Sequence, residues 1–144
     1  AAAAADIRVP GPDLLGAVPL LSGVPASTRR AVQARGVYLD VAAGEEVIRR
    51  WDADRFFYIV LTGRYDVFID TRLIRSHGPG DHFGELAARD WGGGYGYARL
   101  ATVRCAEPGR LLKLTTEDLA WLTDSQPAVK ARIAATLAER LQNR

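Results

Sequence analysis

Short runs of alternating apolar residues, each closed by glycine or aspartate, constrain the fold of this chain more than any other feature. From Val37 onward the apolar residues recur at every second position, which is the period of a half-buried β-strand. Such runs occupy residues 37–41, 47–48, 56–61, 65–69 and 73–74. We expect them to form short antiparallel strands, with tight hairpins at Gly63 and at Asp70–Thr71.

Helices are expected before this strand region, and further strands after it. Residues 14–34 hold short apolar pieces interrupted by proline and glycine, and Gly36 is a helix stop. Strands resume at residues 99–106 and 110–114. The pattern predicts a mainly β domain with short N-terminal helices.

Two helices are expected to close the domain. Thr115 begins a capping signature for a short helix ending near Thr123, and Pro127 suits the first turn of a final helix. The final helix carries one apolar stripe of Val129, Ile133, Leu137 and Leu141, and its charged residues Arg132, Glu139 and Arg140 are expected to point elsewhere.

Composition limits the classes of function. The 144 residues suit one domain, which we place at 13–144 after a linker or tag at 1–12. The 19 basic and 17 acidic residues are scattered, so the domain lacks the basic stripe of a nucleic-acid binder. A single cysteine, Cys105, lies in an apolar run, which favours a buried strand thiol and a cytoplasmic protein. The longest apolar run, Phe56–Leu61, is too short to embed this domain in a membrane, whatever its parent protein does.

One motif points to an anion. In the segment 83–87, Phe-Gly-Glu-Leu-Ala, Gly84 has no Cβ, so the amides after it can approach an anion at the start of a short helix. Arg99 follows fourteen residues after Glu85, and one guanidinium suffices for a singly charged phosphodiester. The Glu85 carboxylate can accept a hydrogen bond from a ribose hydroxyl. Singly these are ordinary core, turn and surface residues, but together they predict a pocket for a small phosphate ester.

With these motifs in order, the chain resembles the cyclic nucleotide-binding domain family from about Leu14 to Leu141. Gly44–Glu45, the segment 57–63 and Pro79–Gly80–Asp81 resemble further family motifs. The resemblance implies an α+β, mainly β fold, an eight-stranded antiparallel β-roll flanked by short N-terminal helices and two C-terminal helices. It also implies a sugar–phosphate site lined by Gly84, Glu85, Leu86, Ala87, Arg99 and Leu100.

The same resemblance bears on the choice of base. Leu100 stands where members that favour guanine often have threonine, which favours cAMP over cGMP as the ligand. The loop between Glu85 and Arg99 is longer than is usual in the family, and its Tyr95 and Tyr97 either stack on the base or pack on their own domain. In the family a residue at or beyond the last helix caps the base, and the candidates here are Leu137, Arg140 and Leu141.

Two other interpretations stay open. The first is a structural or interaction domain that keeps the fold without using a ligand. The second is a cupin-like metalloenzyme that uses His77, His82 and Glu85, although two solvated turn histidines are the simpler expectation. The chain has no nucleophile elbow, Walker loop or Cys-X-X-Cys motif, so we expect no catalytic residue, metal or cofactor. The preferred prediction is a cytoplasmic regulatory sensor whose C-terminal helix shifts on ligand binding to control an attached or partner effector domain.

Overall fold

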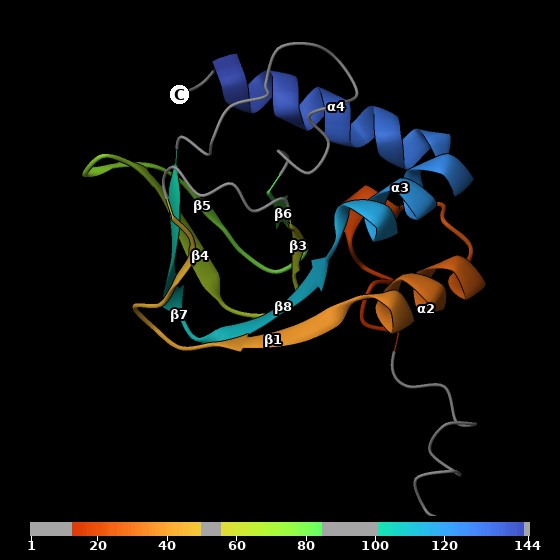
Figure 1. Ribbon diagram of the computed structural model, residues 1–144, viewed down its shortest axis with the longest axis horizontal. Helices are drawn as coiled ribbons and strands as arrows, with labels where there is room; N and C mark the ends of the chain where they lie inside the picture. Colours follow the sequence, from red (N-terminus) through yellow and green to blue (C-terminus); the bar gives the residue numbers. More distant parts are fainter. Residues whose placement is uncertain (1–12, 50–55, 85–100, 143–144) are drawn as a thin grey trace, which may run out of the picture.

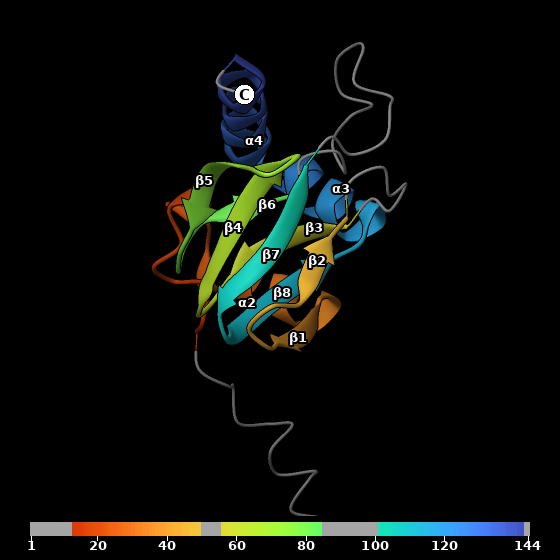
Figure 2. The ribbon, with the colours of Figure 1, turned by 90° about the vertical axis from the view of Figure 1, so that its left-hand side faces the viewer.

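The computed structural model describes residues 13–49, 56–84 and 101–142, with side chains to residue 140. In these ranges eight strands form two four-stranded antiparallel sheets that face each other as a roll (Figures 1 and 2). The first sheet has the order β1 (Val37–Val41), β8 (Gly109–Leu114), β3 (Phe57–Val60) and β6 (His82–Phe83). The second has the order β2 (Glu46–Ile48), β7 (Thr102–Glu107), β4 (Arg64–Ile69) and β5 (Arg72–His77). The predicted eight-stranded β-roll is confirmed.

One of the two predicted hairpins is wrong. β4 and β5 do pair across the turn that contains Asp70, which adopts a φ of 56°. β3 instead pairs with β8 and β6, so the chain changes sheets at Gly63. A Cβ on Gly63 would lie 2.7 Å from the carbonyl oxygen of Glu107, because this corner packs against the β7–β8 connection. Gly63 therefore lies where the chain passes from the first sheet to the second, and not in a hairpin turn.

The helices begin and end where local chemistry predicts. They are η1 (Pro19–Leu21), α2 (Ala26–Arg35), α3 (Thr116–Ser125) and α4 (Pro127–Gln142). The Asp118 amide donates to the Thr115 hydroxyl at 3.1 Å, and the Thr115 amide donates to the Asp118 carboxylate at 3.3 Å. This capping box confirms the predicted start of α3. In the described residues no helix is long and apolar enough to cross a membrane.

The β1–β8–β3–β6 sheet separates two hydrophobic cores. Side chains of β3 alternate between them, which is why all four of its residues are buried. The core between this sheet and the helices contains Phe57, Ile59, Leu112, Leu114, Leu119, Leu122, Val129 and Ile133. The core inside the roll contains Tyr58, Val60, Leu111, Tyr65, Phe83, Val103 and Cys105, so the prediction of a buried strand thiol is confirmed.

Helix α4 extends over β5 and β6 (Figures 1 and 2). Val129 and Ile133 are fully buried, and Leu137 is half-buried, as the apolar stripe predicts. Arg132, however, does not point away from the domain. Its guanidinium donates to the carbonyl oxygens of Leu20 at 2.9 Å and Ser22 at 2.8 Å, because a long side chain beside the stripe can reach the carbonyls exposed around η1.

Candidate functional site

Position 84, where the predicted phosphate motif begins, requires glycine for reasons of backbone conformation and space. β6 pairs with β3 through Tyr58 and Phe83, and Gly84 follows immediately. Gly84 has a φ of +91°, and a Cβ there would lie 2.5 Å from the carbonyl oxygen of Phe56 and 3.3 Å from the Cα of Phe57. Both the left-handed backbone and the close approach to β3 therefore require glycine.

Most of the predicted site lies outside the described residues. This applies to Glu85, Leu86, Ala87, Tyr95, Tyr97, Arg99 and Leu100, and to the side chain of Leu141. The described candidates are Gly84 at the end of β6, and Leu137 and Arg140 on α4 above β5 and β6. The roles of the other residues stay predictions.

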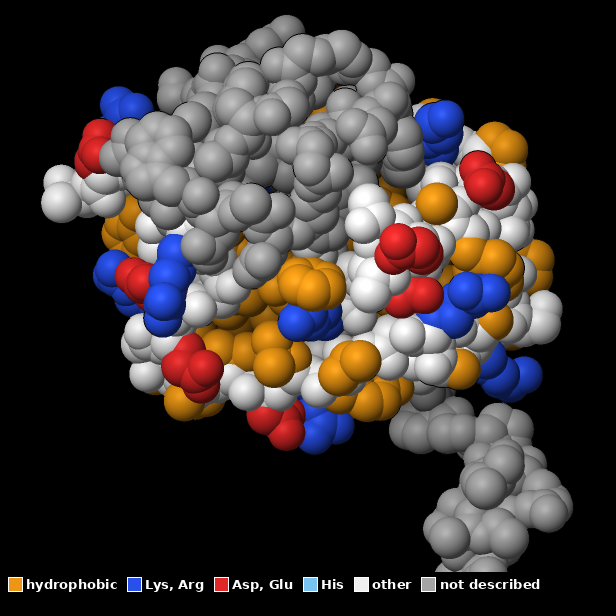
Figure 3. Space-filling view, viewed as in Figure 1, with side chains coloured by type: hydrophobic (Ala, Val, Ile, Leu, Met, Phe, Trp, Pro, Cys, Tyr) orange, Lys and Arg blue, Asp and Glu red, His pale blue; other side chains and the backbone are white. Residues whose placement is uncertain are grey.

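A row of inward-facing side chains crosses the first sheet next to Gly84. Strand pairing places Val37, Lys113, Tyr58 and Phe83 side by side. Tyr58 stacks on Phe83 with 5.1 Å between ring centres, and Val37 is 62% exposed at the rim. Figure 3 shows hydrophobic side chains gathered on this side of the molecule, with a basic side chain among them.

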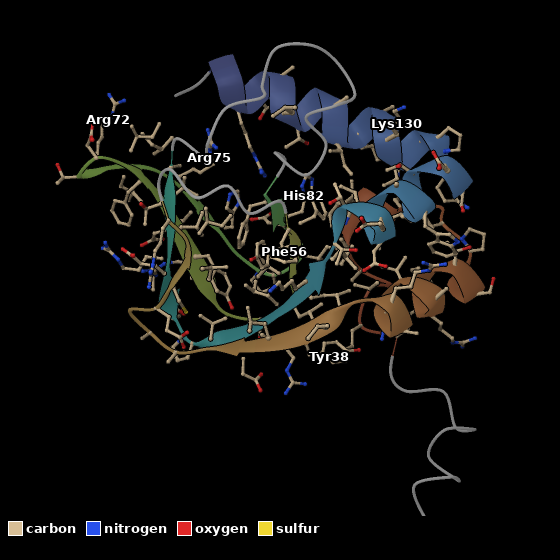
Figure 4. All side chains as sticks on the ribbon, viewed as in Figure 1. Tyr38, Phe56, Arg72, Arg75, His82 and Lys130 are labelled. Atoms are coloured by element: carbon tan, nitrogen blue, oxygen red, sulfur yellow. The ribbon has the colours of Figure 1, made fainter. Side chains whose placement is uncertain are left out.

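Lys113 is the charged member of this row. Its ammonium nitrogen lies 3.8 Å from the centre of the Phe56 ring, which belongs to the residue just before β3 (Figure 4). Neither Lys113 nor Phe56 was predicted from the sequence to be a site residue. The signal was present, because Lys113 shares the strand parity of Leu111, an inward-facing core residue, and breaks the apolar pattern of that face.

The two histidines are buried, which corrects the prediction of solvated turn residues. His77 is 3% exposed and stacks on Phe83 at 5.6 Å, and His82 is 8% exposed and stacks on Phe57 at 5.3 Å. Burial, followed by the nearby Arg140 cation, lowers the pKa of each histidine to about 4. Both are therefore neutral at pH 7. Successive side chains of a strand point to opposite faces, and this places His77 of β5 beside the core inside the roll and His82 of β6 beside the core under the helices. Both histidines are buried although turn residues lie near them in the sequence.

Arg140 also departs from the expectation that it points away from the domain. It is half-buried, and burial lowers its pKa to about 10, with the cation of Arg75 contributing and Asp81 opposing. Arg75 donates from β5 to the carbonyl oxygen of Arg140 at 3.4 Å (Figure 4). The last turns of α4 are thus in contact with the β5–β6 region.

Metal binding has no support within the described ranges. Over residues 13–49, 56–84 and 101–142, no three histidine, cysteine, aspartate or glutamate side chains gather as ligands. Glu85, the third residue of the cupin-like set, lies outside them.

Comparison with known proteins decides the family. The model of the cyclic nucleotide-binding domain matches residues 38–126, from β1 through α3. This chain belongs to the cyclic nucleotide-binding domain family. The resemblance drawn from the glycine turn and the strand motifs is confirmed.

Relatives of this cyclic nucleotide-binding domain include a bacterial effector and a kinase subunit. The Pycsar effector protein BcPycTIR of Burkholderia cepacia is 32% identical over 106 residues, covering 74% of this chain and 34% of that protein. The regulatory subunit of cAMP-dependent protein kinase from Eremothecium gossypii is 49% identical over 47 residues, covering 33% of this chain and 10% of its own length. This chain spans about a third of the length of the Pycsar effectors that it matches.

Solved structures agree with the fold. The catabolite activator protein of Thermus thermophilus superposes with a TM-score of 0.73 at 26% identity, covering 86% of this chain and 58% of that one. The cAMP-bound PfPKA-R fragment 141–441 has a TM-score of 0.74 at 23% identity, covering 91% and 42%, which supports the fold alone.

Proposed function

We propose that this domain is a non-catalytic sensor that binds a cyclic nucleotide in its β-roll, cAMP in preference to cGMP. The observation that carries the proposal is Gly84, which must be glycine at the point where the family's phosphate motif begins. A side chain there would collide with the backbone of β3, so the amides that follow start from a position fixed by the sheet.

The sequence motif supplies the proposed contacts. The amides of Glu85, Leu86 and Ala87 and the guanidinium of Arg99 would bind the phosphate, and the Glu85 carboxylate would bind the ribose. Leu100 lacks the hydroxyl that a guanine-selective site would offer, which is why cAMP is preferred in this proposal.

Helix α4 is the proposed output element. It is held at its base by the buried Val129 and Ile133, and its last turns touch β5 through Arg75 and Arg140. A ligand in the roll can shift α4 only if it binds the two arrangements of the helix with different affinity. The shift would control an effector domain that is attached or a partner, and the buried thiol of Cys105 suits a cytoplasmic protein.

Calorimetric titration tests the proposal. Wild type should give saturable heat with both nucleotides and bind cAMP more tightly than cGMP. Arg99→Ala should weaken binding about 30-fold or more, because the phosphate loses a charged hydrogen-bonding partner. Arg30→Ala, which removes an exposed arginine from α2, is the matched control and should bind as wild type. No saturable heat from either nucleotide would contradict the proposal and favour a ligand-independent structural domain.

A further inference from the structure

The inner face of the first sheet carries a cation that the family comparison does not explain. Lys113 lies on β8, flanked by Val37 of β1 and Tyr58 of β3. Residues of one row on the same face of a sheet point in the same direction, so Lys113 faces the inside of the roll with Tyr58. A lysine on this apolar face requires an explanation, because charged side chains are rarely placed against a core without a partner.

No carboxylate supplies that partner among the described residues. Lys113 takes part in no ion pair there, and its ammonium group lies over the face of the Phe56 ring, 3.8 Å from the ring centre. Asp40, on the neighbouring strand β1, pairs with Arg110 at 2.8 Å, and Glu46 of the second sheet pairs with Arg104 at 3.5 Å. An aromatic face stabilises a cation without neutralising its charge.

The position of this cation relative to Gly84 suggests its role. Gly84 packs on the backbone of Phe56 and Phe57, and Lys113 stacks on the Phe56 ring, so both contact the start of β3. β8 and β6 flank β3 on opposite sides, which places the Lys113 backbone about 10 Å from that of Phe83, with Tyr58 between them. The lysine side chain covers part of this gap, and an anion bound beside Gly84 would cover the rest.

We propose that Lys113 is a cationic contact for the phosphate of the bound nucleotide, additional to the contacts of the phosphate motif. This inference rests on the proposed function. The Phe56 ring holds the ammonium group beside the start of β3, and the anion would supply the charged partner that Lys113 lacks among the described residues. The charge also raises the local positive potential before the ligand arrives, which favours capture of an anion.

The chain offers a matched control, because its only lysines are Lys113 and Lys130. Lys130 is exposed on α4 and points away from the roll (Figure 4). Lys113→Gln should weaken cAMP binding about tenfold and flatten its dependence on salt concentration, because one cation has been removed. Lys113→Arg should keep most of the affinity, and Lys130→Gln should change neither quantity.

Amine labelling read by mass spectrometry gives a second measurement on the wild-type chain. Saturating cAMP should protect Lys113 from acetylation and leave Lys130 as reactive as before. Thermal unfolding of each variant establishes that it is folded. If wild type binds cAMP while Lys113→Gln binds equally well and Lys113 stays unprotected, this inference is wrong and the proposed function stands. If wild type binds neither cAMP nor cGMP, the proposed function fails and this inference fails with it.

Discussion

Gly84 connects the fold to the proposed site through a single residue. Its φ of +91° is costly for any residue with a Cβ, and the space that a Cβ would need is taken by the carbonyl oxygen of Phe56 at 2.5 Å. Because that oxygen belongs to backbone at the edge of β3, the contact cannot be relieved by rotating a side chain. The requirement for glycine therefore arises from the sheet before any ligand is considered.

Gly84→Ala should lower the free energy of unfolding by about 3 kcal/mol, the sum of backbone strain and displacement of β3. Urea denaturation measures this loss. The control is Gly78→Ala, at a glycine that precedes β6 and has nothing within 4 Å of a Cβ. Equal stability of Gly84→Ala and wild type would show that the turn can be rebuilt without cost.

The contact between the β5–β6 region and α4 contains two neutral histidines beside a cation. Because the pKa values of His77 and His82 fall from 6.5 to about 4 on folding, the unfolded chain binds more protons between these values. The contribution of the two buried, neutral histidines to the free energy of unfolding is complete above about pH 6.5, and it is lost as the pH falls toward 4. At pH 5 the loss should be about 2 kcal/mol for each histidine.

Denaturation between pH 5 and 7, above the range in which most carboxylates titrate, checks this expectation. His77→Phe keeps an aromatic ring against Phe83 and removes one titrating group, so its stability should depend less on pH than that of wild type. A wild-type stability that is the same at pH 5 and pH 7 would mean that the histidines can be protonated without opening this contact.

These elements also show what could be predicted from sequence. The capping box of Thr115 and the stop at Gly36 were predicted correctly because they depend on residues a few positions apart.

The hairpin at Gly63 and the exposure of His77 and His82 were predicted wrongly because they depend on which distant strand pairs with β3 and β5. Lys113 could have been noticed as a break in the apolar alternation of β8, but its place beside Phe56 follows from the β3–β8 pairing. Gly84 has the left-handed backbone of a turn glycine, but its role in the predicted site stays a prediction, as do those of the site residues between 85 and 100.

At the scale of the whole molecule, α4 is in contact with both the core of the helices and the β5 strand of the roll. Its base belongs to the core with α3 and the first sheet, whereas its last turns contact β5 through a hydrogen bond of 3.4 Å between Arg75 and the Arg140 carbonyl. The base is held by fully buried side chains and the end by partly buried cations, so the two parts of one helix differ in how firmly they are held.

Saturating cAMP should therefore change hydrogen exchange in the last turns of α4, about residues 135–142, and leave α2 unchanged. Exchange is the suitable measurement because it reports local opening that a melting temperature averages over the molecule. Arg75→Ala should speed exchange in the same turns without ligand, whereas Arg72→Ala, at the exposed start of the same strand by the hairpin tip, should not (Figure 4). A ligand with equal affinity for both arrangements of α4 cannot shift the balance between them. If cAMP raises the unfolding temperature while α4 exchanges as before, the domain therefore binds its ligand but does not signal through this helix.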